Sequence, residues 1–341
     1  MGGGIMGLST AYVLARRGAA VRVIERARVG AGASGGLVGA LAPHVPENWN
    51  AKKAFQLDSL LMAEGFWAEV AALGGVDPGY ARTGRVQPLA DDAAVALARA
   101  RAEGARDLWQ GRGEWRVIPV QDAPGMPVHS PSGYVVHDTL SARLSPRAAG
   151  AALVAALAAL GVGLERGDSP PDGTVLWATG AQGLADLSAD LGYSVGAPIK
   201  GQAALLGADW RNAPQLFLQG VHVIPHADGT VAIGSTTERD FDDASTTDTQ
   251  LDAIIDRVRK AVPALAGAPV LERWAGLRPR SRSRAPMLGA WPGREGHFVL
   301  NGGFKIGFGM APKLAQLAAD LLLTGSADIP PGFHLADNLR T

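Results

Sequence analysis

The stretch GGGIMGLSTAYVLARRGAAVRVIE, residues 2–25, decides the fold of this 341-residue chain. Gly2, Gly4 and Gly7 fit the spacing G-x-G-x-x-G, in which glycines allow a tight turn and a close approach of the backbone to a pyrophosphate. The triplet alone is a weak signal, because the chain contains 45 glycines. The residues that follow it make the pattern specific.

A helix is predicted from this turn to about Arg17, with Gly18 as its left-handed stop. Val21 and Val23 then alternate into Glu25, at the end of a buried parallel strand. An acidic residue at this distance binds ribose hydroxyls and would repel a 2′-phosphate, which excludes NADP. Because the helix N-terminus also offers free N–H groups to a phosphate, we expect this segment to bind an ADP moiety.

The start of the chain departs from this pattern. The fingerprint requires a strand before its first glycine, and only Met1 precedes Gly2. That strand would be central in the sheet. We therefore expect the native chain to extend upstream of Met1; the alternative is a damaged nucleotide site.

Composition bounds the possible functions. Hydrophobic residues make up 47% and charged residues 19%, which is typical of a globular protein that is not membrane-embedded. The 32 basic residues equal the 32 acidic ones, so no net charge favours nucleic acid or acidic membranes. Without cysteine there is no disulfide, thiolate metal site or cofactor link through sulfur. No apolar run is long enough to span a bilayer, and we expect a cytoplasmic protein.

The rest of the chain alternates between two patterns. Helices are expected over about 52–73, 91–108, 145–161 and 312–323, with strands near 85–89, 134–136, 175–180 and 297–300. From about residue 198 the apolar period becomes two, and antiparallel strands are expected over 203–206, 216–224 and 230–235. Asp228 and Gly229 form a hairpin turn there. Thr247 and Gln250 are placed as a capping box for one further helix.

This order predicts an α/β fold with two discontinuous domains. One is a Rossmann-like nucleotide-binding domain that lacks its first β-strand, over 1–80, 138–195 and 272–341. The other is an inserted α+β substrate domain built on an antiparallel sheet, over 81–137 and 196–271.

Seven segments, in this order and spacing, resemble the FAD-dependent D-amino-acid oxidase, glycine oxidase and sarcosine oxidase family. They are GGGIMGLSTAY at 2–12, GASGGLVGALAP at 32–43, VLWATGA at 175–181, KGQ at 200–202, IPHADGTVAIGST at 224–236, GLRP at 276–279 and NGGFKIGFGMAP at 301–312. The resemblance implies bound FAD, not linked through cysteine. It places the cofactor on Gly2, Gly4, Ile5, Met6, Gly7, Glu25, Arg26, Ala33, Ser34, Gly39, Ala40, Leu41, Ala178, Thr179, Gly180, Gly302, Gly303, Phe304, Lys305 and Ile306.

The same resemblance implies three substrate-binding candidates. Arg278, in GLRP, would grip a substrate carboxylate with two parallel bonds; alternatively it belongs to a solvated basic loop with Arg280, Arg282 and Arg284. Lys305 matches a carboxylate-binding lysine of the sarcosine-oxidase-like members, and could instead stabilise reduced flavin or lie at the surface. His222 could face the substrate, although a structural histidine is the better reading.

The implied reaction is the oxidation of an amino acid or N-methyl amino acid by hydride transfer to flavin N5, giving an imine. Oxygen or an electron acceptor would then reoxidise the flavin. No catalytic residue is assigned, and no metal site is expected, since the histidines lack metal-ligand spacing. Three alternatives stay open: a dehydrogenase of the same fold that reduces a quinone, a tRNA-modifying flavin domain, and a binding protein without FAD. The oligomeric state is not predicted.

Overall fold

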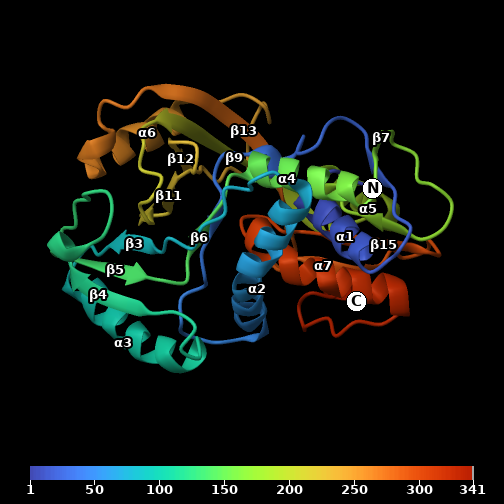
Figure 1. Ribbon diagram of the computed structural model, residues 1–341, viewed down its shortest axis with the longest axis horizontal. Coiled ribbons are helices and arrows are strands. Elements are labelled where there is room, and N and C mark those ends of the chain that lie inside the picture. The colour runs from blue at the N-terminus through green and yellow to red at the C-terminus, as the bar shows by residue number, and fades with distance from the viewer. Residues whose placement is uncertain (340–341) are drawn as a thin grey trace.

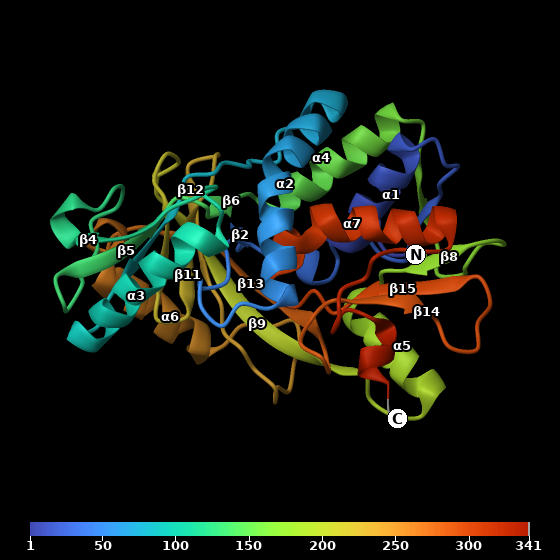
Figure 2. The ribbon, with the colours of Figure 1, turned by 90° about the horizontal axis from the view of Figure 1, so that it is seen from below.

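The computed structural model describes residues 1–339, so the last two residues of the predicted range 272–341 lie outside it. The chain forms two lobes, with helix α2 (Ala51–Gly74) running between them (Figures 1 and 2). Both ends of the described part of the chain lie in one lobe, which contains the glycine turn and is called the nucleotide lobe (Figure 1). The other is called the sheet lobe.

The nucleotide lobe contains two small sheets on either side of the first two residues. Strand β1 (Val23–Glu25) pairs in parallel with β7 (Leu164–Arg166), and β14 (Met287–Ala290), β15 (His297–Asn301) and β8 (Val175–Trp177) form the other sheet. Gly2 N donates to Ile24 O at 2.8 Å, and Ala178 N donates to Met1 O at 2.9 Å. The Met1–Gly2 backbone therefore connects the two sheets.

Four helices bury their apolar faces in one core of this lobe. They are α1 (Ile5–Arg16), α2, α4 (Pro146–Ala159) and α7 (Gly307–Thr324), while α5 (Gly180–Leu191) packs under β8 and β15 with a separate small core. Ser145 caps α4 through a bond from Ala148 N, with Pro146 in the first turn, as predicted. Gly18 is left-handed after α1, also as predicted.

The sheet lobe contains one eight-stranded mixed sheet in the order β13-β9-β12-β11-β10-β3-β5-β4. Every neighbouring pair is antiparallel except β10–β3, which is parallel. Its strands are β3 (Arg85–Pro88), β4 (Trp115–Pro119), β5 (Tyr134–Asp138), β9 (Gly196–Gly207), β10 (Gln215–Leu218), β11 (Val221–Pro225), β12 (Thr230–Gly234) and β13 (Val270–Ser281). A two-stranded antiparallel sheet, formed by β2 (Ala40–Leu41) and β6 (Ala142–Arg143), lies between the lobes.

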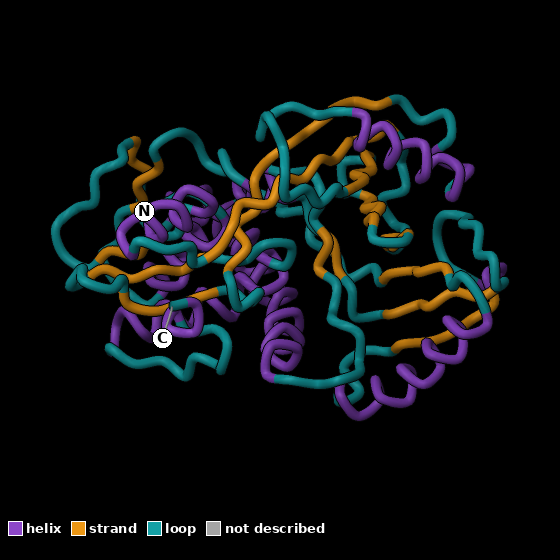
Figure 3. The backbone as a smooth tube through the Cα atoms, turned by 180° about the vertical axis from the view of Figure 1, so that it is seen from behind, coloured by secondary structure: helices purple, strands orange, loops and turns teal. Residues whose placement is uncertain are grey.

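The two faces of this sheet differ in chemistry. One packs apolar side chains such as Val223 and Ile233 against α6 (Thr249–Ala261). By strand register, the opposite face, here called the cation face, carries Trp115, Asp138, Arg85, Gln215, Phe217, His222, Trp274 and Arg278. Helix α3 (Asp92–Leu108) covers its β4–β5 end (Figures 1 and 3).

The structure corrects three predicted elements. The predicted strand 216–224 is two strands, because Gln219 and Gly220 both have positive φ and form a hairpin turn between β10 and β11. The capping box at Thr247 is wrong, since Asp248 is the N-cap and accepts from Gln250 N. Helix α7 begins at Gly307 and not at residue 312, so Pro312 lies inside it.

The described residues also contain four short 3₁₀ turns, at Ala33–Gly35, Val120–Asp122, Pro263–Leu265 and Leu335–Asn338. Within residues 1–339, no helix combines the length and apolar character needed to cross a membrane. In the same range no cluster of three His, Asp or Glu side chains could hold a metal ion.

Candidate active site

A cavity of about 190 Å³ opens at the N-terminus of α1. It is lined by Gly3, Ile5, Leu8, Arg28, Val29, Gly30, Ser34, Gly35, Pro146, Arg147, Gly150 and Phe308. Ile5 and Ser34 were predicted from the sequence to bind the cofactor, and the structure brings them together, with Ile5 N donating to Ser34 Oγ at 3.0 Å.

The helix end at this cavity suits an anion. Gly4 is the N-cap of α1 and gives no side-chain cap, and the first turn contains no acidic residue. The N-terminal N–H groups and the positive end of the helix dipole therefore point toward the cavity without a competing carboxylate in that turn. This is the arrangement that binds phosphate groups.

Close packing explains two of the three glycines in the turn. A Cβ on Gly7 would overlap the carbonyl oxygen of Gly2, and a Cβ on Gly2 would lie 2.5 Å from Ala178 O. Gly2 also has φ +104°, which favours glycine. The predicted residues Ala178, Thr179 and the glycine turn therefore lie against one another, and the buried Oγ1 of Thr179 has no hydrogen-bond partner within residues 1–339.

Glu25 lies at the same turn. Its Oε2 accepts from Gly3 N at 2.6 Å and its Oε1 accepts from Ala27 N at 2.9 Å. The carboxylate thus lies at the glycine turn, whereas the next predicted residue, Arg26, is exposed.

The cavity wall includes residues that the sequence reasoning missed. Arg147, in the first turn of α4, donates from Nε to Gly35 O at 2.9 Å and forms a bidentate ion pair with Glu272. Arg28, Gly150 and Phe308 also line the cavity. Arg28 could have been inferred, because it lies between Glu25 and the left-handed Gly30; Gly150 and Arg147 could not, since only the fold brings α4 to this place.

The segment 36–41 leads from this cavity onto the cation face. A Cβ on Gly36 would lie 3.3 Å from the Trp274 ring, and one on Gly234 would lie 3.1 Å from Val38. The predicted residues Gly39, Ala40 and Leu41 follow, and a Cβ on Gly39 would overlap Leu144 O. This loop therefore joins the nucleotide cavity to the sheet that carries the predicted substrate-binding residues.

The turn at 302–306 approaches from the other side. Gly303 packs on Met6, since a Cβ there would lie 2.8 Å from the Met6 methyl group. Phe304 N donates to Pro279 O at 3.0 Å, and Phe304 has a positive φ of 44°. The turn is thus fixed to α1 at one end and to β13 beside Arg278 at the other.

Arg278 is a buried cation with free donors. It is 7% exposed, and its Nη1 donates to Thr236 O at 3.2 Å. In residues 1–339 no carboxylate oxygen lies within 4 Å of its nitrogens. Burial lowers the pKa of Arg278 to about 10, and the nearby Glu238 carboxylate opposes that shift. Its position on β13 shows that the solvated-loop reading of Arg278 is wrong.

Lys305 lies beside Arg278. Its Nζ donates to Thr237 Oγ1 at 2.7 Å, and the residue is exposed to solvent. Burial of the ammonium group, together with the charge of Arg278, lowers the pKa of Lys305 to about 8. The structure therefore brings together the two cations that the sequence analysis treated as alternatives.

His222 is a neutral member of the same face. Its Nδ1 lies 3.3 Å from Gln215 Oε1, and its ring packs against Phe217 at 4.8 Å between centroids. Burial, then the charges of Arg85 and Lys305, lowers the pKa of His222 to about 3. It can therefore face a ligand as an uncharged imidazole with one ring nitrogen already engaged.

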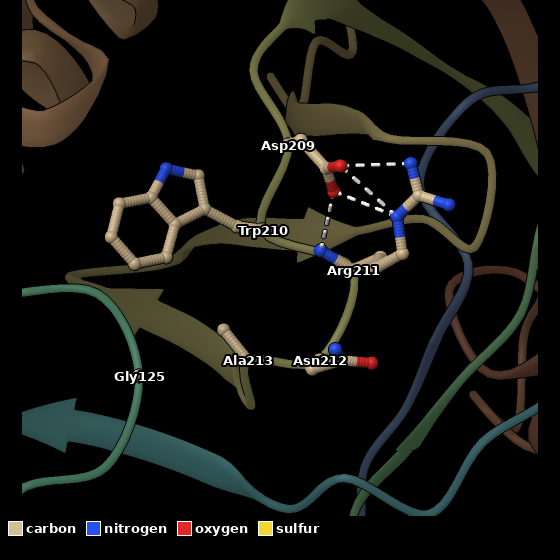
Figure 4. A pocket seen from close by; sticks show the side chains of 6 residues that line it. All are labelled: Gly125, Asp209, Trp210, Arg211, Asn212 and Ala213. Atoms are coloured by element: carbon tan, nitrogen blue, oxygen red, sulfur yellow. Dashed lines mark hydrogen bonds and ion pairs between the residues drawn. The ribbon is translucent and has the colours of Figure 1, made fainter.

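A larger, open hollow of about 410 Å³ lies elsewhere on the sheet lobe (Figure 4). It is lined by Gly125 and by residues 209–213, and Asp209 and Arg211 pair with each other within it (Figure 4). Trp210 and Ala213 pack with the core on the α6 side of the sheet. The hollow is therefore separate from the cation face.

The residues present fit FAD. A glycine turn, a helix N-terminus whose N-cap residue is a glycine, and two arginines surround one cavity, and the loop 36–41 and the turn 302–306 continue from it to the two cations. These donors match a pyrophosphate, and the chain has no cysteine to attach a flavin.

Comparisons with known proteins agree with this geometry. Residues 1–321 match the family described as FAD dependent oxidoreductase. Glycine oxidase from Pseudomonas putida is 31% identical over 97% of this chain and 95% of that protein. Two solved structures share the fold at 22% identity. The TM-score is 0.83 for glycine oxidase from Geobacillus kaustophilus, covering 97% of this chain and 96% of that one. It is 0.85 for iminodiacetate oxidase from Chelativorans sp. BNC1, covering 96% of each.

Proposed function

The chain belongs to the family of FAD-dependent oxidoreductases, and we propose that it oxidises the amine of a small amino acid or N-methyl amino acid whose carboxylate is bound by Arg278 and Lys305. The observation that carries this proposal is the pairing of these two cations, with no carboxylate of the described chain within 4 Å of either. The names of the relatives, glycine oxidase and iminodiacetate oxidase, support the same substrate class.

The cofactor would lie between the two halves of this site. Gly4, Ile5 and Ser34 would hold the pyrophosphate, Glu25 the adenosine ribose, and the segments 39–41 and 302–306 the flavin. FAD bound there supplies an acceptor for a hydride from the substrate carbon.

Arg278 is suited to hold the carboxylate. Only one bond of its guanidinium is made to the described chain, to a backbone carbonyl, so other donors can form parallel bonds to a planar carboxylate. Because Arg278 is buried, such charge-assisted bonds are stronger than they would be in water. The carboxylate would thereby fix the position of the neighbouring substrate carbon.

The same cations influence the substrate amine. Two positive charges close to an amine disfavour its protonated form and lower its pKa. His222 adds no charge, because its pKa of about 3 keeps it neutral. The site would therefore favour the neutral amine that the oxidation requires, without a dedicated base.

The proposal is tested with the purified, FAD-loaded protein under anaerobic conditions. Glycine, sarcosine, proline and D-amino acids are added in turn, and the loss of flavin absorbance is followed together with the formation of the oxidised product. Bleaching by at least one member of this panel is expected; bleaching by none would contradict the substrate class.

We also propose oxygen as the acceptor that restores the flavin, on the grounds of the oxidase relatives. Rapid mixing of the reduced protein with air-saturated buffer should restore the flavin absorbance. Recovery only with a quinone would favour the dehydrogenase alternative.

A further inference from the structure

One short segment, Thr236–Glu238, anchors both cations of the site. Thr236 contributes its carbonyl oxygen to Arg278 Nη1 at 3.2 Å, and Thr237 contributes its hydroxyl to Lys305 Nζ at 2.7 Å. Since these residues are adjacent, the segment sets the separation of the guanidinium from the ammonium. Anything that fixes the segment therefore also fixes the carboxylate site.

The segment is tied to β9 by its backbone. Lys200 N donates to Glu238 O at 3.0 Å, and Glu238 N donates to Lys200 O at 3.0 Å. Thr236 N donates to Gln202 O at 3.2 Å, and Gln202 N donates to Thr236 Oγ1 at 2.8 Å. The contact continues the β9–β12 pairing beyond the end of β12.

The buried side chain of Glu238 stabilises this contact through hydrogen bonds and an ion pair. It is 6% exposed, and its Oε1 accepts from Gln202 Nε2 at 3.0 Å and from Thr236 Oγ1. Its Oε2 lies 3.6 Å from the ammonium of Lys200, which is itself 3% exposed. A buried carboxylate of this kind is stable only because it is paired and hydrogen-bonded.

Glu238 also acts on Arg278 through its charge without occupying its donors. Within residues 1–339 the two side chains form no ion pair shorter than 4 Å, yet the carboxylate raises the pKa of Arg278 against the effect of burial. Lys200 faces Glu238 and the half-exposed Asp248, which lies 3.8 Å from Lys200, whereas Lys305 is influenced by the charge of Arg278.

We infer that Glu238 is a positioning residue of the carboxylate site, which holds Thr236 and Thr237 against β9 so that Arg278 and Lys305 stay at a fixed separation. This inference rests on the proposed function, because it assumes that the two cations bind a carboxylate. The Glu238 side chain would act through its partners Gln202, Thr236 and Lys200. Its neighbours with charge are Lys200 on β9, Asp248 at the start of α6, and Arg278 on β13.

The test measures the binding of acetate, a small carboxylate, to the FAD-loaded protein. Binding is detected by the change that acetate causes in the flavin spectrum. Thr237→Val removes the hydroxyl that holds Lys305 and changes no charge, so acetate affinity should fall about fivefold. Glu238→Gln keeps the shape but leaves Lys200 without its buried partner, so the segment should loosen and affinity should fall about tenfold.

The pH profile separates positioning from a general loss of structure. In Glu238→Gln the second alkaline fall of acetate affinity, which Arg278 causes near about 10 in the wild type, should move to lower pH, because the carboxylate no longer favours the protonated guanidinium. Asp248→Asn is the matched control, since it also removes a carboxylate near Lys200 and asparagine still caps α6. Both affinity and pH profile should stay at the wild-type values in that control.

Arg278→Met distinguishes the inference from the function on which it rests. If Arg278→Met loses acetate while Thr237→Val and Glu238→Gln both bind it as the wild type does at every pH, the inference is wrong and the proposed function stands. If Arg278→Met binds acetate normally, the carboxylate site is wrong, and the role of Glu238 falls with it.

Discussion

The ammonium of Lys305 and the guanidinium of Arg278 lie close enough to repel each other, and this repulsion contributes to lowering the pKa of Lys305 to about 8. Two like charges in a partly buried site are unfavourable unless an anion joins them. A substrate carboxylate would convert the repulsive pair into a three-centre attraction. The relationship therefore favours carboxylate binding more strongly than either residue would alone.

Carboxylate affinity should depend on pH in two steps. A bound carboxylate favours the protonated cations, so affinity is highest below the pKa of Lys305 and falls as pH rises through about 8. A second fall should follow near about 10, where Arg278 begins to lose its proton. Acetate titrations of the FAD-loaded protein at a series of pH values measure both. Lys305→Met should remove the first step; an unchanged first step in that variant would assign it to another group.

Arg278→Met should weaken substrate binding far more than the same substitution of a neighbouring arginine does. Losing one charge-assisted, bidentate contact of about 1.5–3 kcal/mol corresponds to a roughly 10- to 100-fold rise in KM. Arg280→Met is the control, because Arg280 lies two residues along the same strand and stacks on Phe304. Equal effects of the two substitutions on KM would show that general positive charge, and not Arg278, binds the carboxylate.

Gly7→Ala should abolish FAD binding. Its Cβ would overlap the Gly2 carbonyl oxygen, so α1 must move away from the strand end and the N-terminal N–H groups leave the cavity. Gly65→Ala in the exposed part of α2 is the control, since nothing lies within 4 Å of its Cβ. The Gly65→Ala substitution should raise the free energy of unfolding by about 0.5–1 kcal/mol, and the variant should still bind FAD. Flavin content after purification gives the result directly, and a yellow Gly7→Ala protein would contradict it.

The buried pair of Arg85 and Asp138 should be essential for stability. Arg85 Nε donates to Asp138 Oδ2 at 2.8 Å, with the side chains 7% and 0% exposed. Asp138→Asn leaves a buried guanidinium without its counter-charge, and unfolding free energy should fall by about 3–5 kcal/mol. Denaturant unfolding of Asp209→Asn, whose partner Arg211 lies at the surface, provides the comparison and should change little. Similar losses in both variants would mean that burial of the first pair is not what matters.

Much of the fold was predictable from local pattern. Ser145 followed by Pro146 marked the start of α4, and Gly18 marked the end of α1, because these residues fit cap positions for steric reasons that need no tertiary context. The hairpin at Gln219 was not predictable in the same way. Gln is rare at positive φ, so the apolar run across it read as one strand.

The site was predictable in its residues but not in its arrangement. The sequence indicated Arg278 and Lys305 separately. Only the fold brings them together, so that each donates a hydrogen bond to one of two adjacent residues, Thr236 and Thr237. Arg147 and Glu238 gave no local signal, because their roles depend on contacts with Gly35 and Lys200, more than 30 residues away along the chain. The assignment of individual residues to FAD and substrate stays a prediction.

The most direct test compares glycine with methylamine as reductants of the bound flavin, measured anaerobically on one preparation of the FAD-loaded protein. The two amines differ by the carboxylate that Arg278 and Lys305 are proposed to bind. Glycine should bleach the flavin far faster than methylamine in the wild type, and Arg278→Met should remove most of that difference. Equal rates for the two amines in the wild-type protein would contradict carboxylate recognition as the basis of its activity.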